Sequence, residues 1–288
     1  MYTIKETLKQ GSEKLKNTQD KPILMSRLIL QYILKKEKEY LLVHDDEKIN
    51  IEDYDKFIKS INRLNEGIPL QYITNLQEFM KINFYVDENV LIPQPDTEIL
   101  VENVLELIKD KEALILDLCT GSGAIAISIA KHSENAKVTA TDLSEKALDI
   151  ARLNSKNNNT DIEFILSDMF KNLENRKFDF IVSNPPYIKT NEIKKLSNEV
   201  QNEPHMALDG GQDGLDFYRI IINEGYKYLN ENGYICLEIG FDQKDDVLNL
   251  IKESGRYSDI KCYRDLGGND RVIIFKKRRE FYDFFCRS

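Results

Sequence analysis

Apolar side chains return every three or four residues in the first part of the chain, which is the spacing of one face of an α-helix. One such face follows Pro22, a residue that the first turn of a helix tolerates well, and a second lies between residues 54 and 64. The pattern predicts a small helical bundle over residues 1–74. Because the bundle shows no constellation of chemistry-bearing residues, we expect it to dock a partner. The apolar positions are Ile23, Leu24, Leu28, Ile33 and Leu34, then Tyr54, Phe57, Ile58, Ile61 and Leu64.

The periodicity changes between residues 75 and 95. Residues 79–86 are rich in aromatic and β-branched side chains, which favours a strand or a hairpin, and Pro93 and Pro95 interrupt the segment that follows. Asp96 and Thr97 then precede an apolar segment, residues 99–108, as capping residues precede a helix. We therefore expect a β-hairpin and linker over residues 75–95, and the main domain over residues 96–288.

From Ala113 onward, strand-like and helix-like segments alternate. Such alternation favours a mostly parallel sheet with helices on both faces. Ser144 is placed to cap the helix after the second strand. The last two strands are joined by a loop too short for a crossover helix, so they should form an antiparallel hairpin at the sheet edge. The expected strands are residues 114–118, 137–142, 162–166, 178–183, 234–239, 259–263 and 271–275, with a helix at 124–131.

The formal net charge of −9 is unevenly distributed along the 288 residues. Residues 1–72 carry 13 Lys and Arg against 12 Asp and Glu, and the remainder carries 27 against 37. An acidic main domain does not favour stable binding to nucleic acid, which needs clustered basic residues. The basic run Lys276–Arg279 is interpreted as a solvated tail after the last strand.

Composition indicates a globular protein with reduced cysteines. The apolar runs are shorter than the roughly 20 residues that cross a bilayer, and the first residues lack the layout of a signal peptide. The cysteines, at positions 119, 236, 262 and 286, form no C-x-x-C pair, and the three histidines are scattered, so we expect neither a disulfide framework nor a metal site. These features predict a cytoplasmic protein that is not bound to a membrane, and we expect it to be a monomer.

A glycine turn follows the first strand of the main domain, within Asp117–Gly123. Gly121 and Gly123 let the backbone turn tightly and approach a ligand. Asp142 lies 19 residues beyond Gly123, at the end of the next strand, where a carboxylate can accept hydrogen bonds from ribose hydroxyls. With Ala126 in place of a third glycine, this motif by itself is compatible with NAD as well as with other nucleosides.

A second landmark, Asn184-Pro185-Pro186-Tyr187, directly follows the strand at 178–183. Because the carboxyl ends of parallel strands face one cleft, it should lie near the glycine turn. The Asn184 side-chain oxygen and the Pro185 carbonyl can each accept one N–H of a planar NH₂ group, which positions a weakly nucleophilic nitrogen for methyl transfer and stabilises its developing charge. The prolines stiffen the backbone, and Tyr187 offers a flat face to a planar substrate.

The tetrapeptide could instead be an ordinary turn, since Asn and Pro are common turn formers. The order of glycine turn, acidic residue and tetrapeptide, each at a strand end, favours a methyltransferase over that interpretation. The chemistry of the tetrapeptide does not choose between a side-chain amide and the exocyclic amine of a base.

Together these stretches resemble the HemK/PrmC family, the protein-(glutamine-N(5)) methyltransferases that modify peptide chain release factors. The resemblance covers nearly the whole chain. It rests on the glycine turn and on Gly67–Ile73 (GIPLQYI), Leu91–Glu98 (LIPQPDTE), Ser183–Ile188 (SNPPYI), Ala207–Tyr218 (ALDGGQDGLDFY) and Asp265–Val272 (DLGGNDRV).

The resemblance implies a class I fold: a Rossmann-like, seven-stranded, mostly parallel sheet with a C-terminal antiparallel hairpin, plus a small N-terminal helical bundle. It also implies S-adenosylmethionine as cofactor and, as substrate, the glutamine of a Gly-Gly-Gln motif in release factors. The implied cofactor contacts are Cys119, Thr120, Gly121, Ser122, Gly123, Asp142, Met169 and Asn184. The implied substrate contacts are Asn184, Pro185, Pro186 and Tyr187, of which Asn184, Pro185 and Tyr187 are catalytic.

Three features depart from the family pattern. Met169 stands where members often have an aromatic residue, Gln94 stands where many have Arg, and the tail from Lys276 to Ser288 runs past the usual end of the fold. The competing hypotheses are methylation of an exocyclic amine of adenine or guanine in DNA or RNA, and a non-catalytic binding module. The acidic main domain disfavours the first, and the intact Asp142 and tetrapeptide disfavour the second. The chain's own Gly210-Gly211-Gln212 is interpreted as a chance match to the substrate motif.

Overall fold

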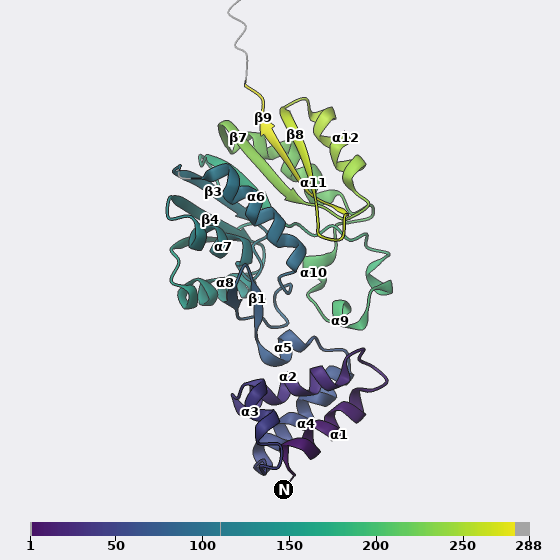
Figure 1. The fold of residues 1–288 in the computed structure, drawn as a ribbon. Helices are drawn as coiled ribbons and strands as arrows, with labels where there is room; N and C mark the ends of the chain where they lie inside the picture. The colour runs from purple at the N-terminus through teal and green to yellow at the C-terminus, as the bar shows by residue number, and fades with distance from the viewer. Residues whose placement is uncertain (1, 110, 280–288) are drawn as a thin grey trace, which may run out of the picture. The chain divides into compact units, whose positions relative to one another are not determined.

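The structure of this protein is a computed structural model that describes residues 2–109 and 111–279 (Figure 1). The chain folds into two compact units. The first comprises the residues up to Leu76 together with the distant segment Leu196–Asn202, and the second comprises Gln77–Lys195 and the residues from Glu203 onward. The sequence pattern places Leu196–Asn202 in the main domain, whereas its contacts group it with the N-terminal helices. Cys286 and the end of the basic tail lie outside the described residues.

The first unit is a bundle of α-helices. Helix α1 (Ile4–Leu15) begins at a capping box, in which Thr3 and Glu6 each accept the other's backbone N–H. Gly11 allows close packing, because a β-carbon there would lie 2.5 Å from the Phe57 ring. The helical bundle that the apolar spacing predicts is therefore confirmed. The other helices are α2 (Pro22–Leu34), α3 (Lys38–Val43), α4 (Ile51–Asn65), α5 (Leu70–Thr74) and α9 (Asn198–Gln201).

The second unit begins with a small hairpin, in which β1 (Gln77–Phe79) pairs antiparallel with β2 (Ile82–Phe84). A 3₁₀ turn, η1 (Pro95–Thr97), then leads into helix α6 (Glu98–Ile108). The predicted capping of this helix by Thr97 is wrong, because the Thr97 hydroxyl donates instead to Glu238, which lies 141 positions further along the chain. The predicted cap at Ser144 is confirmed, since its hydroxyl oxygen accepts the backbone N–H of Ala147.

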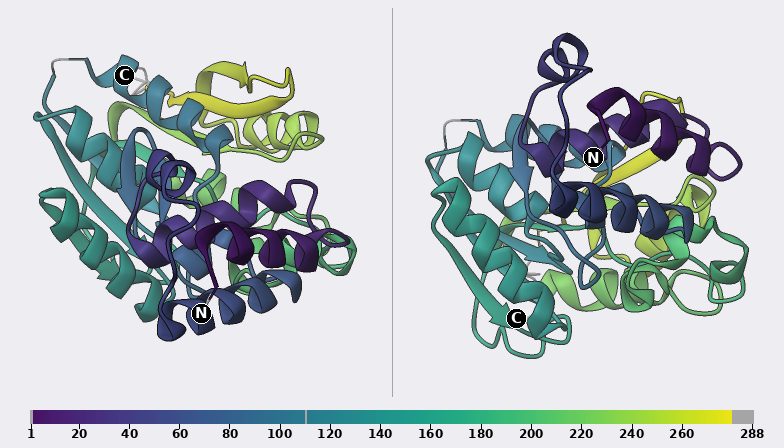
Figure 2. Two further views of the ribbon diagram at one scale, coloured as in Figure 1. Left: turned by 60° about the horizontal axis from the view of Figure 1, so that its bottom comes forward. Right: turned by 90° about the horizontal axis from the view of Figure 1, so that it is seen from below.

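A seven-stranded sheet forms the centre of the second unit, in the order β5-β4-β3-β6-β7-β9-β8. Its first five strands in this order are parallel, and β9 pairs antiparallel with both β7 and β8. This confirms the predicted mostly parallel sheet with a C-terminal hairpin. In the left view of Figure 2 the yellow end of the chain lies at one side of the sheet and the teal strands at the other. The strands are β3 (Ala113–Leu118), β4 (Ala136–Asp142), β5 (Ile162–Leu166), β6 (Phe178–Ser183), β7 (Leu229–Glu238), β8 (Tyr257–Arg264) and β9 (Asp270–Lys277).

Helices cover both faces of this sheet. The chain runs from β3 outward to β5 and then returns to start a second series at β6, so right-handed crossovers place the helices of the two series on opposite faces. Helix α6 packs on α7 and α7 on α8, whereas α11 packs on α12 (Figure 1). The bounds are α7 (Ala124–His132), α8 (Glu145–Asn158), α11 (Asp216–Glu224) and α12 (Lys244–Ser254), with the short η2 (Ile193–Lys195), α10 (His205–Leu208) and η3 (Gly225–Lys227) between strands.

The basic run near the C-terminus differs in part from the predicted solvated tail. Lys276 and Lys277 belong to β9, and Lys277 forms an ion pair with Glu231 at 3.2 Å. Arg278 Nε donates to the backbone oxygen of Tyr257 at 2.8 Å. Within the part of the chain that the structure describes, no helix combines the length and apolarity needed to cross a membrane.

Candidate active site

The strand order reverses between β3 and β6, and a cavity of about 330 Å³ opens beyond the carboxyl ends of the central strands. Such a switch point is where open α/β sheets bind their ligands, and the volume is in the range of small-molecule sites. The lining residues come from the ends of β3 to β6, from the loop at residues 89–91, from α10 with its flanking residues, and from the first turn of α11: Asn89, Val90, Leu91, Cys119, Gly121, Thr141, Asp142, Leu143, Ser167, Asp168, Met169, Asn184, Pro186, Pro204, His205, Met206, Ala207, Asp209 and Phe217.

The glycine turn between β3 and α7 has a backbone that few residues adopt. Cys119, Gly121 and Gly123 all have positive φ, at 58°, 55° and 82°. A β-carbon on Gly123 would lie 2.9 Å from Ile127 and 3.2 Å from Ala151, so only glycine fits there without displacing α7 or α8. The turn therefore exposes its backbone to the cavity at Cys119 and Gly121.

A buried hydrogen bond between Asp117 and Thr120 stabilises this turn on the side away from the cavity. The Thr120 hydroxyl donates to Asp117 Oδ2 at 2.6 Å, and both side chains are buried. Burial raises the pKa of Asp117 to about 7, although the Thr120 hydroxyl and the backbone N–H of Ala126 lower it. Asp117 is thus a buried part of the turn and does not line the cavity.

Asp142 ends β4 and lines the cavity beside the turn. Its Oδ2 accepts the backbone N–H of Gly121 and its Oδ1 that of Ser144, both at 2.9 Å. Burial raises its pKa, while backbone donors, among them Gly121 and Ser144, oppose the rise. A carboxylate held in this way keeps a second lone pair on each oxygen, which can accept the hydroxyls of a ribose.

The remaining walls suit the other parts of a nucleoside with a sulfonium side chain. Met169, which follows β5 and has a φ of 51°, places its sulfur 3.9 Å from the Cys119 sulfur. The hydroxyl of Ser167 donates to the Met169 carbonyl at 2.8 Å and fixes this loop. S-adenosylmethionine needs an acceptor for its ribose hydroxyls, a backbone turn that it can approach closely and an apolar surface, and these residues supply all three, so they fit the cofactor.

The tetrapeptide follows β6 at the other side of the switch point. Asn184 and Pro186 line the cavity. Asn184 Nδ2 donates to the Thr97 hydroxyl oxygen at 3.2 Å, so Oδ1 is the atom that Asn184 can offer to the cavity. Pro185 is buried, and its side chain is not among those that line the cavity.

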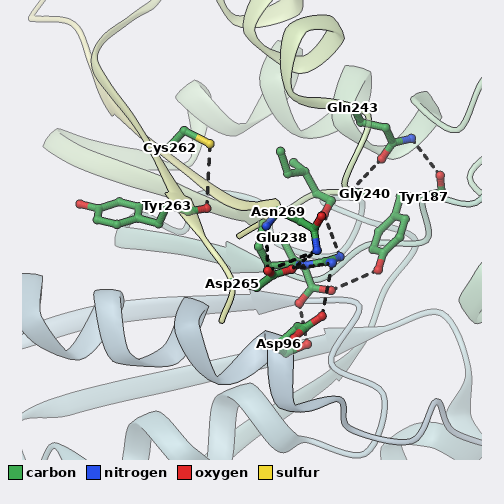
Figure 3. Close-up of polar contacts among 12 residues, drawn as sticks. Asp96, Tyr187, Glu238, Gly240, Gln243, Cys262, Tyr263, Asp265 and Asn269 are labelled. Atoms are coloured by element: carbon green, nitrogen blue, oxygen red, sulfur yellow. Dashed lines mark hydrogen bonds and ion pairs between the residues drawn. The ribbon is translucent and has the colours of Figure 1, made fainter. Parts of the chain in front are cut away.

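Tyr187 does not line the cavity, and its hydroxyl points into a polar cluster at Glu238 (Figure 3). Its hydroxyl donates to Glu238 Oε1 at 3.3 Å, and its carbonyl accepts from Gln243 Nε2 at 2.9 Å. Burial, with Glu238 nearby, raises the pKa of Tyr187 well above its usual value. The flat face that the sequence analysis attributes to Tyr187 stays a prediction.

The polar cluster behind the tetrapeptide contains Glu238, which Figure 3 labels together with Asp96 and Asp265, and Arg271. Arg271 forms ion pairs with Asp265 at 3.0 Å and with Asp96 at 3.3 Å, and its guanidinium also donates to the carbonyl of Ile239. Burial raises the pKa of Glu238 to about 7, against the lowering effects of the Thr97 hydroxyl, Arg271 and Tyr187. The resemblance motifs LIPQPDTE and DLGGNDRV therefore meet in this cluster, since one contributes Asp96 and Thr97 and the other Asp265 and Arg271.

The structure brings some of the predicted site residues to the cavity and leaves others behind it. Cys119, Gly121, Asp142, Met169, Asn184 and Pro186 line the cavity, whereas Thr120, Ser122, Gly123, Pro185 and Tyr187 do not. Thr97, predicted only as a helix cap, and Glu238 were not predicted as residues of the site. The motif LIPQPDTE around Thr97 could have indicated a role for this residue. No sequence motif surrounds Glu238, and its role becomes visible only in the fold, where β7 lies beside η1. Among the described residues no group of His, Cys, Asp and Glu is arranged to hold a metal ion.

Two known sequence profiles match this chain. The methyltransferase small domain matches residues 94–212, and the PrmC N-terminal domain matches residues 6–74. Among solved structures, a methyltransferase from Pyrococcus furiosus superposes with a TM-score of 0.52 at 25% identity, over 69% of this chain and 90% of that one. Fold, cavity and comparisons define a class I S-adenosylmethionine-dependent methyltransferase.

Curated relatives narrow the class to one family. The release factor glutamine methyltransferase of Clostridium acetobutylicum is 38% identical over 278 residues, which are 94% of this chain and 97% of that protein. The protein of the same name from Thermodesulfovibrio yellowstonii is 43% identical over 87% of this chain and 91% of that protein. The chain belongs to the release factor glutamine methyltransferase (PrmC) family, which confirms the resemblance that the sequence motifs indicated.

Proposed function

We propose that this protein transfers a methyl group from S-adenosylmethionine to the side-chain amide nitrogen of the glutamine in the Gly-Gly-Gln motif of peptide chain release factors. The cofactor, when bound, supplies an electrophilic methyl group on sulfur. The observation that carries the proposal is Asn184, which lines the cavity with its Nδ2 engaged by Thr97 and thus offers an acceptor oxygen.

The substrate amide is a weak nucleophile because its nitrogen lone pair is delocalised into the carbonyl. In our proposal, Asn184 Oδ1 accepts one of its N–H groups. The Pro185 carbonyl, which lies outside the cavity lining of this structure, is the acceptor that the motif predicts for the other, and the two contacts would fix the nitrogen in line with the methyl group. Positioning of this kind contributes on the order of several kcal/mol to catalysis. As the N–C bond forms and the S–C bond breaks, both acceptors stabilise the positive charge on nitrogen, and the proton then leaves to water.

Glycine turn, Asp142 and Met169 hold the cofactor in this proposal. Cys119 and Gly121 present backbone to it, Asp142 accepts its ribose hydroxyls, and Met169 covers an apolar part. Thr120, Ser122 and Gly123 act from behind the cavity by shaping the turn. The glycine at position 123 is needed because a side chain there would collide with the two helices beside it.

The net charge of the second unit favours glutamine over a nucleobase as the methylated group. The acidic balance of residues 73–288 opposes binding to a polyanion. We also propose that the helical N-terminal unit docks the release factor, that the protein acts as a monomer without stable nucleic-acid binding, and that it works in the cytoplasm, where its substrate acts.

The chain's own Gly210-Gly211-Gln212 has a structural role in this proposal. The backbone N–H of Gly210 donates to the Ile188 carbonyl at 2.8 Å, and the Gly211 carbonyl accepts from Thr190 at 3.0 Å. Both glycines are thus fastened to the segment that follows the tetrapeptide. Gln212 lies with Thr190, Asn191 and Lys194 rather than in the active-site cavity, which supports a chance match to the substrate motif.

The proposal is tested by offering methyl-labelled cofactor with purified release factor, DNA or RNA. We expect label on the release factor alone, located on its Gly-Gly-Gln glutamine by mass spectrometry. Asn184→Ala should lower turnover at least about 100-fold, as expected when a catalytic acceptor is removed, with cofactor binding still detectable. Asn191→Ala, in an exposed part of the following loop, is the matched control and should keep wild-type turnover. Label on nucleic acid alone, or full turnover by Asn184→Ala, would contradict the proposal.

A further inference from the structure

A side-chain amide can face a cavity in two ways, and only one of them suits Asn184. The substrate NH₂ group is a donor, so Asn184 must present Oδ1, an acceptor, to the cavity. The reverse orientation would set the Asn184 NH₂ group against the substrate NH₂ group. Such a mismatch leaves buried donors without acceptors, which is costly in a site that excludes water.

The Thr97 hydroxyl contacts both Asn184 and Glu238. Its oxygen lies 3.2 Å from Asn184 Nδ2 and 2.5 Å from Glu238 Oε2, and both Thr97 and Glu238 are buried. A hydroxyl has a single proton to donate. Because Thr97 donates that proton to the carboxylate, its oxygen is left as an acceptor, and only the NH₂ side of the Asn184 amide matches it.

The surroundings of Glu238 favour its side chain as an acceptor of hydrogen bonds. The Tyr187 hydroxyl donates to its Oε1 at 3.3 Å, and the Tyr218 hydroxyl donates to its backbone carbonyl at 3.1 Å. Arg271 brings a positive charge beside it, itself balanced by Asp96 and Asp265. Figure 3 shows the Tyr187 hydroxyl directed at Glu238. The contacts of Thr97 with Asn184 and with Glu238 give the chain of hydrogen bonds a fixed direction, from Asn184 through Thr97 to Glu238.

We propose that Thr97 and Glu238 are positioning residues, which fix the side-chain amide of Asn184 with its oxygen toward the cavity and thereby set its ability to receive the substrate nitrogen. This inference rests on the proposed function of Asn184. The two residues touch neither substrate nor cofactor and act only through Asn184. The same chain of hydrogen bonds gives a reason for the contact between the motif LIPQPDTE and β7, because this contact places Thr97 beside Glu238.

Thr97→Val tests the proposal because valine keeps the shape of threonine but can neither accept nor donate. With release factor as substrate, we expect kcat to fall about 10- to 100-fold, the size typical of leaving a buried partner unsatisfied, while the Kd for cofactor changes less than about 2-fold. Thr97→Ser restores the hydroxyl and should keep kcat within about 3-fold of wild type. The matched control is Thr139→Val, which removes a buried strand hydroxyl that donates to Glu163 away from the site.

Glu238→Gln gives a second measurement that does not depend on how well Thr97→Val folds. An amide at position 238 can turn either way and no longer fixes the direction of the Thr97 proton. The groups that face position 238 are Thr97 and Asp96 from η1, Tyr187 after β6, Tyr218 from α11 and Arg271 from β9. Wild-type kcat should decline as the pH falls through about 7, where Glu238 becomes protonated, and this decline should be smaller in Glu238→Gln.

The outcomes separate the positioning proposal from the proposed function. Wild-type enzyme that does not methylate release factor would overturn both. Active wild-type enzyme with unchanged kcat in Thr97→Val, or with Thr97→Ser as impaired as Thr97→Val, would overturn the positioning role alone. A decline in kcat toward low pH that is as large in Glu238→Gln as in wild type would likewise overturn the role of Glu238.

Discussion

Asp117, Glu203 and Glu238 are buried carboxyl groups of the second unit, and burial raises the pKa of each. Asp117 accepts from a threonine in the glycine turn, Glu238 accepts from Thr97 and a tyrosine, and Glu203 accepts the backbone N–H of Ile92 at 2.9 Å. Burial raises the pKa of each to about 7. Glu203 joins the segment at Ile92 to the loop that begins at Pro204, and both neighbourhoods line the cavity.

Glu203 should make the protein less stable as the pH rises. Since its pKa in the folded state is about 7, above the value of about 4.3 in an unfolded chain, the folded state binds more protons between these values. The stabilisation from protonated Glu203 is complete below pH about 4.3 and is lost as the pH rises through about 7. It amounts to at most on the order of 4 kcal/mol. Glu203→Gln, which stays neutral, should therefore show a smaller decrease in unfolding free energy than wild type between pH 5 and pH 8.

Urea unfolding of both proteins at the two pH values measures this difference. An equal decrease in wild type and Glu203→Gln would contradict the expectation. Glu192→Gln serves as the control, because Glu192 lies at the surface in an ion pair with Lys195. Such surface pairs contribute at most about 1 kcal/mol to stability.

At the scale of elements, the loop between β6 and α11 acts as a support for the tetrapeptide. Ile188 pairs with Asp209 as an isolated parallel bridge, with hydrogen bonds from Ile188 to the Leu208 carbonyl and from Gly210 to the Ile188 carbonyl. Gly210 passes so close that a β-carbon on it would lie 2.7 Å from the Tyr187 Cα. The motif at residues 207–218 is thus explained by packing against the tetrapeptide rather than by chemistry of its own.

Gly210→Ala should therefore displace the tetrapeptide. We expect turnover to fall at least about 10-fold and stability to fall by about 1–3 kcal/mol, because the colliding atoms are backbone and cannot rotate away. Gly255→Ala is the control: this glycine ends α12 with a φ of 67° and has open space around it. It should lose about 1–2 kcal/mol of stability from its backbone conformation alone and keep full activity. Wild-type turnover in Gly210→Ala would show that the close approach has no consequence for catalysis.

At the scale of the whole molecule, each unit has a core of its own. Phe57 is fully buried among the helices of the first unit, and Phe170 is buried under the sheet of the second. All the residues that line the active-site cavity belong to the second unit. Cofactor binding should therefore depend on one core and not on the other.

Phe57→Ala and Phe170→Ala test this division as a matched pair. Each removes a buried ring and should cost about 3–5 kcal/mol of stability in its own unit. At low temperature Phe57→Ala should keep the Kd for cofactor within about 2-fold of wild type, whereas Phe170→Ala, next to Met169, should weaken binding about 10-fold or more, since a core cavity there releases the loop. Titration calorimetry measures both constants. Loss of cofactor binding in Phe57→Ala would contradict independent cores.

Local patterns in the sequence were sufficient to predict the sheet and to locate the main motifs of the site along the chain. Strands of buried apolar residues, such as 178–183, and the short loop before β9 predict the mostly parallel sheet and its antiparallel hairpin, because both depend on neighbouring residues. The glycine turn and Asn184 could be located for the same reason: each lies at the end of a strand that the pattern identifies.

Contacts between distant residues were decided only by the tertiary structure. The sequence predicts that Thr97 caps a helix, but its hydroxyl donates to Glu238. The sequence also places Leu196–Asn202 in the main domain, but this segment packs with the first unit. A single hydroxyl has several acceptors within reach, and which one it takes depends on the strand that folding brings beside it. The sequence by itself determined the chemistry that is present, and the fold decided which way the Asn184 amide faces.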